Sequence, residues 1–252
     1  MRGRAVMFGL LACFVGCRFG DSSAEPLSLE KLRVTLAQRE AKLGGFEAAF
    51  ASTPVDPLEQ QRAWRVAFRQ PAALRVDAFS PDKAVHVYDG ESYWVSRGEE
   101  PLRVNTVPDD AAERAGFLAE TFRPFLPEGF RTPLFPTRGT RAKRIAHPKG
   151  PVAVAITTEI AQDSAAPLRV TTLLRWPSGD FLETRWEGSD GRVEVTMLQE
   201  HCSTQAICLP TLLAHSRDGT RTSETKAEQL QMGRPPESVF DSAATGANNS
   251  RR

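Results

Sequence analysis

Hydrophobic and polar residues alternate with a period of two along most of the chain beyond residue 45. Trp64, Val66 and Phe68 alternate with basic or small residues, and the pattern returns in later segments up to residue 197. Such alternation is typical of strands with one buried face. Turn sequences such as Asp89-Gly90, a hairpin signal, separate the segments. The pattern therefore predicts about eleven strands in an antiparallel meander with short turns.

Two segments depart from this alternation and predict helices. Leucines recur at helical spacing over residues 29–43, after a candidate N-cap at Ser28. Residues 109–122 contain good helix formers with acidic residues at the start. The stretch 123–136 is too apolar for a solvated linker and too proline-rich for a central strand. We expect the second helix and this stretch to fold over the open side of the sheet.

The first residues have the pattern of an export signal. Two arginines precede an apolar run over residues 5–15, which is too short to span a bilayer. The Phe-Val-Gly-Cys sequence at residues 14–17 resembles the bacterial lipobox, whose cysteine is acylated. We interpret residues 1–16 as a lipoprotein signal peptide and Cys17 as the lipidated residue. Two alternatives stay open, which are acylation at Cys13 and a plain signal peptide with an incidental cysteine.

The remainder of the chain divides into three parts. Residues 17–27 are mostly small and polar, and we interpret them as a tether. No shift in composition marks a boundary within residues 28–242, which we interpret as a single domain. Residues 243–252 are small and polar again, and we expect a disordered tail there.

Charge and motifs exclude several functions. The 32 Lys and Arg residues nearly balance the 31 Asp and Glu residues, and loss of Arg2 and Arg4 with the signal would leave 30 against 31. Without a basic excess, we expect no nucleic-acid partner. The sequence has no glycine-rich phosphate loop, no His-Glu-x-x-His helix and no Gly-x-Ser-x-Gly elbow. We therefore predict neither an enzyme nor a cofactor or metal. His86 alternates with two valines and is interpreted as a surface residue.

The two cysteines in the second half are Cys202 and Cys208. In an exported protein such a pair is expected to oxidise, and the intervening five residues can close a small loop. An alternative is a metal site that adds His201 and His215, but structural zinc sites prefer two to four residues between paired cysteines. We predict the disulfide.

The segment from Trp64 to Ser96 resembles the LolA family of periplasmic lipoprotein carriers. The family shows a strand running into a proline, an arginine-containing strand, a second proline, and an apolar strand that leads into Asp-Gly and Trp. The matching residues here are Pro71, Arg75, Pro81, Asp89, Gly90 and Trp94. Residues 46–50 resemble the family's first strand, and residues 235–240 resemble its closing segment.

The resemblance implies a mainly β (α+β) fold, namely an unclosed antiparallel β-barrel whose concave face is lidded by helices. In this family the apolar cavity receives acyl chains. The related receptor LolB is itself an outer-membrane lipoprotein, which agrees with Cys17. The MucB and RseB sensors share the fold, so a non-enzymatic sensor or assembly factor is the alternative function.

The resemblance and the strand pattern together assign site residues. The residues expected to line an acyl-chain cavity are Trp64, Val66, Phe68, Leu74, Val76, Val85, Val87, Trp94, Leu174, Trp176 and Trp186. The residues expected in the lid are Phe117, Leu118, Phe122 and Phe125. In the carrier an arginine on an early strand holds the lid shut, and Arg65 or Arg69 is its expected counterpart.

These assignments predict an exported protein that is lipid-anchored to the outer membrane and faces the periplasm, with the inner membrane and the cell surface left open. Its expected function is to bind acyl chains of lipoproteins or lipids for lipoprotein localisation or transport. Its expected partners are those acyl chains, the membrane through the N-terminal anchor, and a periplasmic carrier protein. We expect a monomer.

Overall fold

The computed structural model of the chain describes residues 27–98, 100–130, 139–147, 150–161 and 166–241. The predicted signal peptide, Cys17 and the predicted tail lie outside these residues. Leu27, which the prediction places in the tether, is buried, and its backbone N–H donates to the carbonyl of Ala142. The packed structure therefore includes the last residue of the predicted tether.

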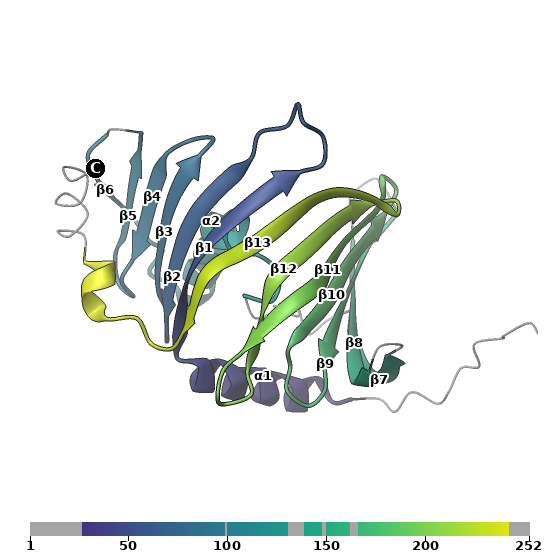
Figure 1. Cartoon of the computed structure of the whole chain (residues 1–252). Helices are drawn as coiled ribbons and strands as arrows, with labels where there is room; N and C mark the ends of the chain where they lie inside the picture. The colour runs from purple at the N-terminus through teal and green to yellow at the C-terminus, as the bar shows by residue number, and fades with distance from the viewer. Residues whose placement is uncertain (1–26, 99, 131–138, 148–149, 162–165, 242–252) are drawn as a thin grey trace, which may run out of the picture.

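The described strands belong to one antiparallel sheet of thirteen, in the spatial order β6-β5-β4-β3-β2-β1-β13-β12-β11-β10-β9-β8-β7 (Figure 1). Their bounds are β1 Gly45–Pro54, β2 Arg62–Arg69, β3 Ala73–Ser80, β4 Ala84–Tyr88, β5 Tyr93–Arg97, β6 Arg103–Asn105, β7 Thr140–His147, β8 Gly150–Ile160, β9 Leu168–Arg175, β10 Phe181–Gly188, β11 Gly191–Cys202, β12 Cys208–Arg217 and β13 Thr220–Met232. The predicted mainly β fold is confirmed, although the described residues form thirteen strands where the sequence predicts about eleven. β6 and β7, which lack a clear alternation of apolar residues, form the edges.

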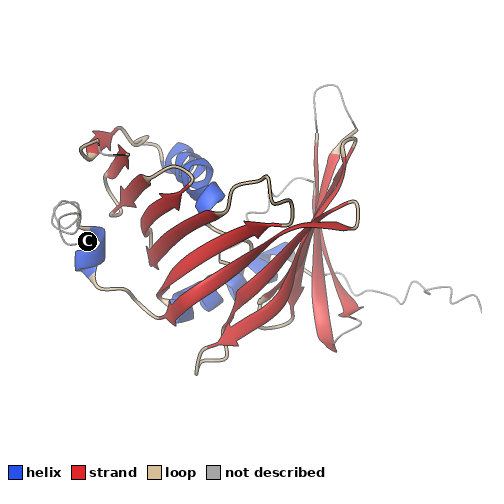
Figure 2. Ribbon diagram, turned by 45° about the horizontal axis from the view of Figure 1, so that its top comes forward, coloured by secondary structure: helices blue, strands red, loops and turns tan. Residues whose placement is uncertain are grey.

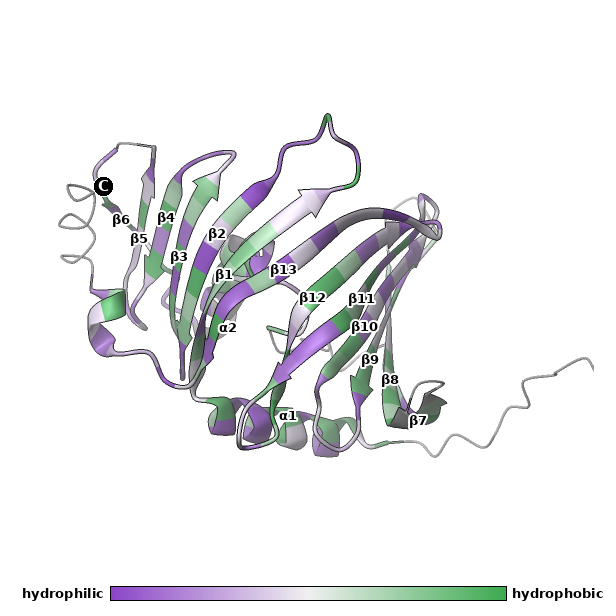
Figure 3. Cartoon of the chain, viewed as in Figure 1, coloured by the Kyte–Doolittle hydropathy of each residue, from purple (hydrophilic) through white to green (hydrophobic). Residues whose placement is uncertain are grey.

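The sheet is unclosed because its first and last strands in sequence pair in its middle. β1 pairs with β13. The free edges are therefore β6 and β7, the two strands that flank the α2–η1 segment in sequence. The long strands twist and curve into a half-barrel, with helices on the concave side (Figure 2). On several strands, bands of hydrophobic and hydrophilic residues alternate (Figure 3), as expected where successive side chains point to opposite faces of the sheet.

Helix α1 (Leu29–Leu43) lies across one end of the half-barrel (Figure 1). Leu32 and Leu36 are buried among residues of β7–β12, whereas Leu43 is buried among residues of β1–β5. The helix ends at Gly44, which takes the left-handed conformation that glycine adopts without strain. The predicted leucine stripe therefore joins the two halves of the sheet.

Helix α2 (Ala111–Phe122) and the short 3₁₀ helix η1 (Arg123–Phe125) cover the concave face of β1–β5. Asp110 accepts a hydrogen bond from the backbone N–H of Glu113 and so satisfies one orphan donor at the start of α2. A second 3₁₀ helix, η2 (Glu237–Phe240), packs on the outer face of β2 and β3. None of the helices in the described part of the chain is long and apolar enough to cross a membrane.

Candidate ligand-binding cavity

A cavity of about 620 Å³ lies between the α2–η1 segment and the concave faces of both halves of the sheet. Its uncharged lining residues are Phe68, Pro71, Ala72, Leu74, Tyr88, Leu118, Ala119, Phe122, Leu126, Phe130, Val170, Thr172, Thr184 and Trp186. Four charged residues also line it, namely Glu40, Glu120, Arg123 and Glu128. Because Glu120 and Arg123 are exposed, we place the mouth of the cavity beside them. An apolar interior with a charged mouth is typical of a site for an apolar ligand.

The wall formed by β1–β5 is filled with aromatic side chains. Phe50 stacks on Trp64 with ring centroids 5.4 Å apart, and the ring of Phe130 meets Phe46 and Phe50 edge-on at 5.1 and 4.8 Å. Phe68 is half-buried beside this cluster and borders the cavity. Close packing therefore leaves the free volume further along the concave face, toward the other half of the sheet.

The opposite wall, formed by β9 and β10, carries a valine, two threonines and one tryptophan. The strand register places Val170 beside Trp186 and Thr172 beside Thr184. The hydroxyl oxygens of the two buried threonines lie 3.1 Å apart and hydrogen-bond each other. Since these hydroxyls already have a partner, an apolar ligand can contact this wall without leaving a buried polar group unpaired.

The structure distributes the eleven predicted cavity residues over four environments. Those that line the cavity are Phe68, Leu74 and Trp186. Those buried on the same face, within the cluster under the α2–η1 segment, are Trp64, Val66 and Val76. Those that pack in the cluster beneath α1 are Leu174 and Trp176. Those on the opposite face of the sheet are Val85, Val87 and Trp94.

The last group is a correction with a physical reason. Val76 faces the cavity side, and the register pairs it with His86, so Val85 and Val87 must point outward. Val87 is nevertheless completely buried, between Arg75 and Trp94 on the neighbouring strands. These apolar residues of the outer face therefore have the same alternating pattern in sequence as residues of the concave face.

His86 belongs to the concave side, so its interpretation as a surface residue is wrong. Its Nδ1 lies 2.7 Å from the hydroxyl oxygen of Tyr93, and its ring contacts Phe122 and Phe125 at centroid distances of 6.2 and 5.1 Å. Burial, and to a smaller extent the nearby charge of Arg97, lowers the pKa of His86. The sequence signal that could have found it is the hairpin, because pairing Tyr88 with Tyr93 fixes which face His86 takes.

We call the α2–η1 segment the lid. All four predicted lid residues pack against the cluster of β1–β5; they are Phe117, Leu118, Phe122 and Phe125. One hydrogen bond also joins the lid to the sheet, because the indole N–H of Trp64 donates to the carbonyl oxygen of Phe125 at 2.7 Å. Tyr93 adds an edge-on contact with Phe117 at 5.5 Å.

Neither predicted lid-holding arginine faces the lid. Trp64 and Phe68 point inward, so the alternating positions Arg65 and Arg69 point outward. Arg69 pairs with Glu237 at 2.9 Å and lies over the ring of Phe240, which places it against η2. The strand that was expected to hold the lid through an arginine instead contacts it through the indole of Trp64.

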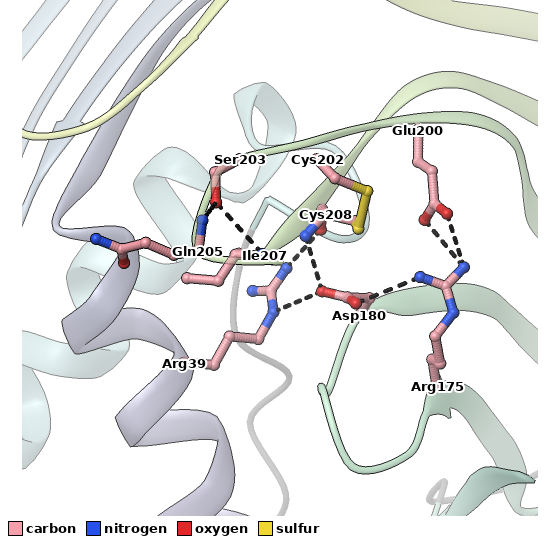
Figure 4. The surroundings of a disulfide bond; sticks show 9 residues. All are labelled: Arg39, Arg175, Asp180, Glu200, Cys202, Ser203, Gln205, Ile207 and Cys208. Atoms are coloured by element: carbon pink, nitrogen blue, oxygen red, sulfur yellow. Dashed lines mark hydrogen bonds and ion pairs between the residues drawn. A yellow bond between two sulfur atoms is a disulfide. The ribbon is translucent and has the colours of Figure 1, made fainter.

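At the other end of the half-barrel, α1 is fixed by a buried ion network around a disulfide (Figure 4). Asp180 accepts hydrogen bonds from Arg39 Nε at 3.2 Å, from Arg175 at 3.3 Å and from the backbone N–H of Cys208 at 3.0 Å. Arg39 also donates to the carbonyl of Cys208 at 2.8 Å. Arg175 further donates to Glu200, and this hydrogen bond raises the pKa of Arg175.

The predicted disulfide between Cys202 and Cys208 is confirmed. Its sulfur atoms are bonded to each other and so do not act as thiolate metal ligands, and His215 pairs instead with Thr225, Nε2 to Oγ1 at 3.0 Å. The alternative metal site is therefore wrong. The β11–β12 hairpin that carries the disulfide contacts α1 and is part of its support.

Comparisons with known proteins gave matches among solved structures. No protein-family model and no curated protein matches the sequence. Among solved structures, the chain is similar to a LolA superfamily protein, NE2245 from Nitrosomonas europaea, at 10% identity and a TM-score of 0.49 over 83% of this chain and 96% of that chain. It is also similar to a putative outer membrane lipoprotein-sorting protein domain from Vibrio parahaemolyticus, at 11% identity and a TM-score of 0.52 over 85% and 96%.

At such identities a structural likeness speaks for the fold and leaves the ligand and the site residues undetermined. The comparison with the Vibrio domain covers nearly all of that domain and most of this chain. It supports the fold seen here, an unclosed antiparallel sheet with helices packed against it. The chain has the LolA/LolB-like fold.

Proposed function

We propose that this protein is a non-enzymatic envelope protein that binds the acyl chains of lipoproteins or lipids in the cavity beneath the lid, for lipoprotein localisation or transport. The observation that carries the proposal is the apolar cavity of about 620 Å³ between the lid and the two halves of the sheet. The likeness to a domain described as sorting outer-membrane lipoproteins supports the same class of ligand.

The burial of methylene groups supplies the affinity. Each buried methylene contributes about 0.8 kcal/mol, so about ten contribute roughly 8 kcal/mol, the free energy of a micromolar complex. The lid and the cavity share the same apolar surface, so a ligand chain replaces some of the contacts that the lid makes when the cavity is empty. Release of the ligand then depends on how easily the lid re-forms its own contacts with the sheet.

The membrane attachment is part of the same proposal. The lipobox-like sequence that ends at Cys17 supports export and acylation, and the basic start and short apolar run support a signal peptide. More than one fatty chain on a residue gives stable membrane anchoring. Cys17→Ala should release the protein into the soluble periplasmic fraction, and unchanged membrane association would contradict anchoring at that residue.

A cavity-filling substitution tests acyl binding. Ala119 lies on α2 and lines the cavity, so Ala119→Trp should fill part of the volume and weaken binding of a fluorescent fatty acyl probe by about tenfold. Glu113→Trp places the same side chain at an exposed position of the same helix and should leave binding unchanged. Equal effects of both variants would show that the probe binds elsewhere.

A second measurement uses the protein as isolated from cells. Solvent extraction and mass analysis should recover bound acyl lipid, and the delipidated protein should bind the probe saturably. Failure of both measurements would overturn the carrier proposal and would favour an interaction protein with the same fold.

A further inference from the structure

A second cleft, of about 800 Å³, lies between the lid and the free edge of the sheet at β4–β6. Its lining is more polar than that of the cavity, and comprises His86, Tyr93, Val95, Arg97, Glu100, Arg103, Asn105, Thr106, Phe117 and Thr121. At its inner wall, His86 and Tyr93 are joined by their hydrogen bond of 2.7 Å. A half-buried imidazole and a buried phenol thus border an open, polar cleft.

Among the described residues, the charges of the cleft leave one unneutralised cation. Arg103 and Glu100 approach each other at 3.8 Å, and both are well exposed. Arg97 makes no ion pair with any residue that the structure describes, and its charge is felt by His86 and Tyr93. The described charges of the cleft therefore favour an anion, and the hydroxyl and amide groups of Thr106, Thr121 and Asn105 supply hydrogen-bond donors.

The charged residues of the apolar cavity have the opposite net sign. Glu40, Glu120 and Glu128 line the cavity together with a single cation, Arg123. A negatively charged group in this cavity would meet three carboxyl groups and one guanidinium, which is unfavourable. An acyl lipid with an anionic headgroup is therefore better accommodated if its headgroup occupies the cleft.

Cleft and cavity are separated by a single layer of aromatic side chains. Phe122 borders the cavity, and its ring lies 6.0 Å from that of Tyr93 and 6.2 Å from that of His86, which border the cleft. The two spaces also share α2, which turns Phe117 and Thr121 toward the cleft and Leu118 and Phe122 toward the cavity. A small movement of the lid that displaces Phe122 would join them.

We propose that this cleft binds the negatively charged phosphate or carboxylate headgroup of an acyl lipid whose chain occupies the cavity, with Arg97 as the principal contact. This proposal rests on the proposed function, because it assigns a headgroup site to the same ligand. It goes further by predicting that the protein distinguishes anionic lipids from uncharged lipids of equal chain length.

The test compares a fluorescent fatty acid with its methyl ester on the delipidated full chain. The wild-type protein should bind the acid more tightly than the ester. Arg97→Gln should weaken binding of the acid by about tenfold and leave the ester unchanged, because only the acid loses a charge-assisted hydrogen bond. Arg217→Gln, at an exposed arginine of β12 that lines neither the cleft nor the cavity, is the matched control and should affect neither probe. Arg123→Gln removes the cation beside the cavity mouth and tests that alternative position of the headgroup.

The outcomes separate the two proposals. Binding of both probes with no effect of Arg97→Gln would overturn the headgroup site and leave the acyl cavity standing, whereas binding of neither probe would overturn both. A loss of acid binding in Arg123→Gln alone would place the headgroup at the cavity mouth and overturn the assignment to the cleft. Inorganic phosphate is titrated separately. If it binds as tightly as the acid, the cleft is a site for a free anion and the headgroup assignment is wrong.

Discussion

The two helices on the sheet are held by different kinds of interaction. Helix α1 is tied to the turn before β10 and to the β11–β12 hairpin by the network around Asp180, whose side chain is only 2% exposed. The lid is held by aromatic contacts and by the hydrogen bond from Trp64. One helix is therefore fixed by directional bonds between charges and the other by apolar packing with one directional bond to the sheet.

This difference suggests that the two helices have different roles. A buried ion network fails badly when a single partner is lost, so it suits a part of the fold that should keep one position. Apolar contacts are non-directional, so an acyl chain can replace those of the lid with little net cost. We infer that α1 is the permanent floor of the half-barrel and that α2 with η1 is its exchangeable cover.

The largest expected effect comes from removing the centre of the α1 network. Asp180→Ala leaves Arg39 without its carboxylate partner and the N–H of Cys208 without an acceptor, and should lower the free energy of unfolding by about 3 kcal/mol, as measured by denaturant titration. Glu159→Ala is the control, because it breaks an ion pair with Arg169 in which both side chains are 56% exposed, and should cost less than about 1 kcal/mol. Similar losses in the two variants would show that the network around Asp180 stabilises the fold no more than an exposed ion pair does.

The next effect concerns the disulfide beside the same network. Replacing Cys202 and Cys208 by serine should cost about 2 kcal/mol of stability, the loop-closure value for a ring this small. Hydrogen exchange should rise in α1 and in the β11–β12 hairpin, because Arg39 contacts the carbonyl of residue 208. Faster exchange in the lid, with α1 unaffected, would contradict a role of the disulfide in supporting α1.

A smaller effect is expected from the hydrogen bond that joins the lid to the sheet. Trp64→Phe keeps an aromatic ring in the cluster but removes the donor to Phe125, and should cost about 1 kcal/mol. If the lid opens to exchange ligand, release of a bound acyl probe should become about fivefold faster, measured by stopped-flow fluorescence. Trp94→Phe changes a tryptophan on the outer face and should leave the release rate unchanged. An equal acceleration in both variants would mean that the bond of Trp64 does not restrain the lid.

Much of this fold could be predicted from the sequence because its two periodicities are clear. The leucines of α1 and the alternation in β2 and β3 report correctly which large side chains point into the core. The alternation fails in β4, where Val87 is buried on the outer face and His86 is half-buried on the inner one. When both faces of a strand are partly covered, only the pairing with its neighbours decides which face is which.

Long-range contacts explain the remaining differences between the sequence predictions and the structure. Asp180 follows a Pro-Ser-Gly turn and reads in sequence as a solvated turn residue, yet 141 positions separate it from Arg39, its partner in α1. The outward position of Arg65 and Arg69 follows from the alternation of β2, but the resemblance to a carrier family favoured an inward role. Here the strand pattern was the better guide, because it reports directly on burial in this chain.

The smallest expected effect is a pH dependence of lid opening. Burial, with a smaller contribution from Arg97, lowers the pKa of His86 below its ordinary value of about 6.5, so the unfolded or opened state takes up a proton first as the pH falls. The stability that neutral His86 gives to the closed lid is therefore present above about pH 6.5 and is lost at lower pH. Hydrogen exchange of the α2 amides, corrected for intrinsic rates, should report easier opening at pH 5.5 than at pH 7.5.

Two variants assign this pH dependence to one half of the molecule. His86→Gln should remove it from α2, since glutamine does not titrate. His215 also has a pKa lowered by burial, but it lies on β12, where it bonds Thr225. His215→Gln should therefore leave the pH dependence of α2 intact and reduce that of β12 and β13. If instead α2 responds to His215→Gln, the two halves of the sheet are coupled, and the lid does not open independently of the structure that α1 supports.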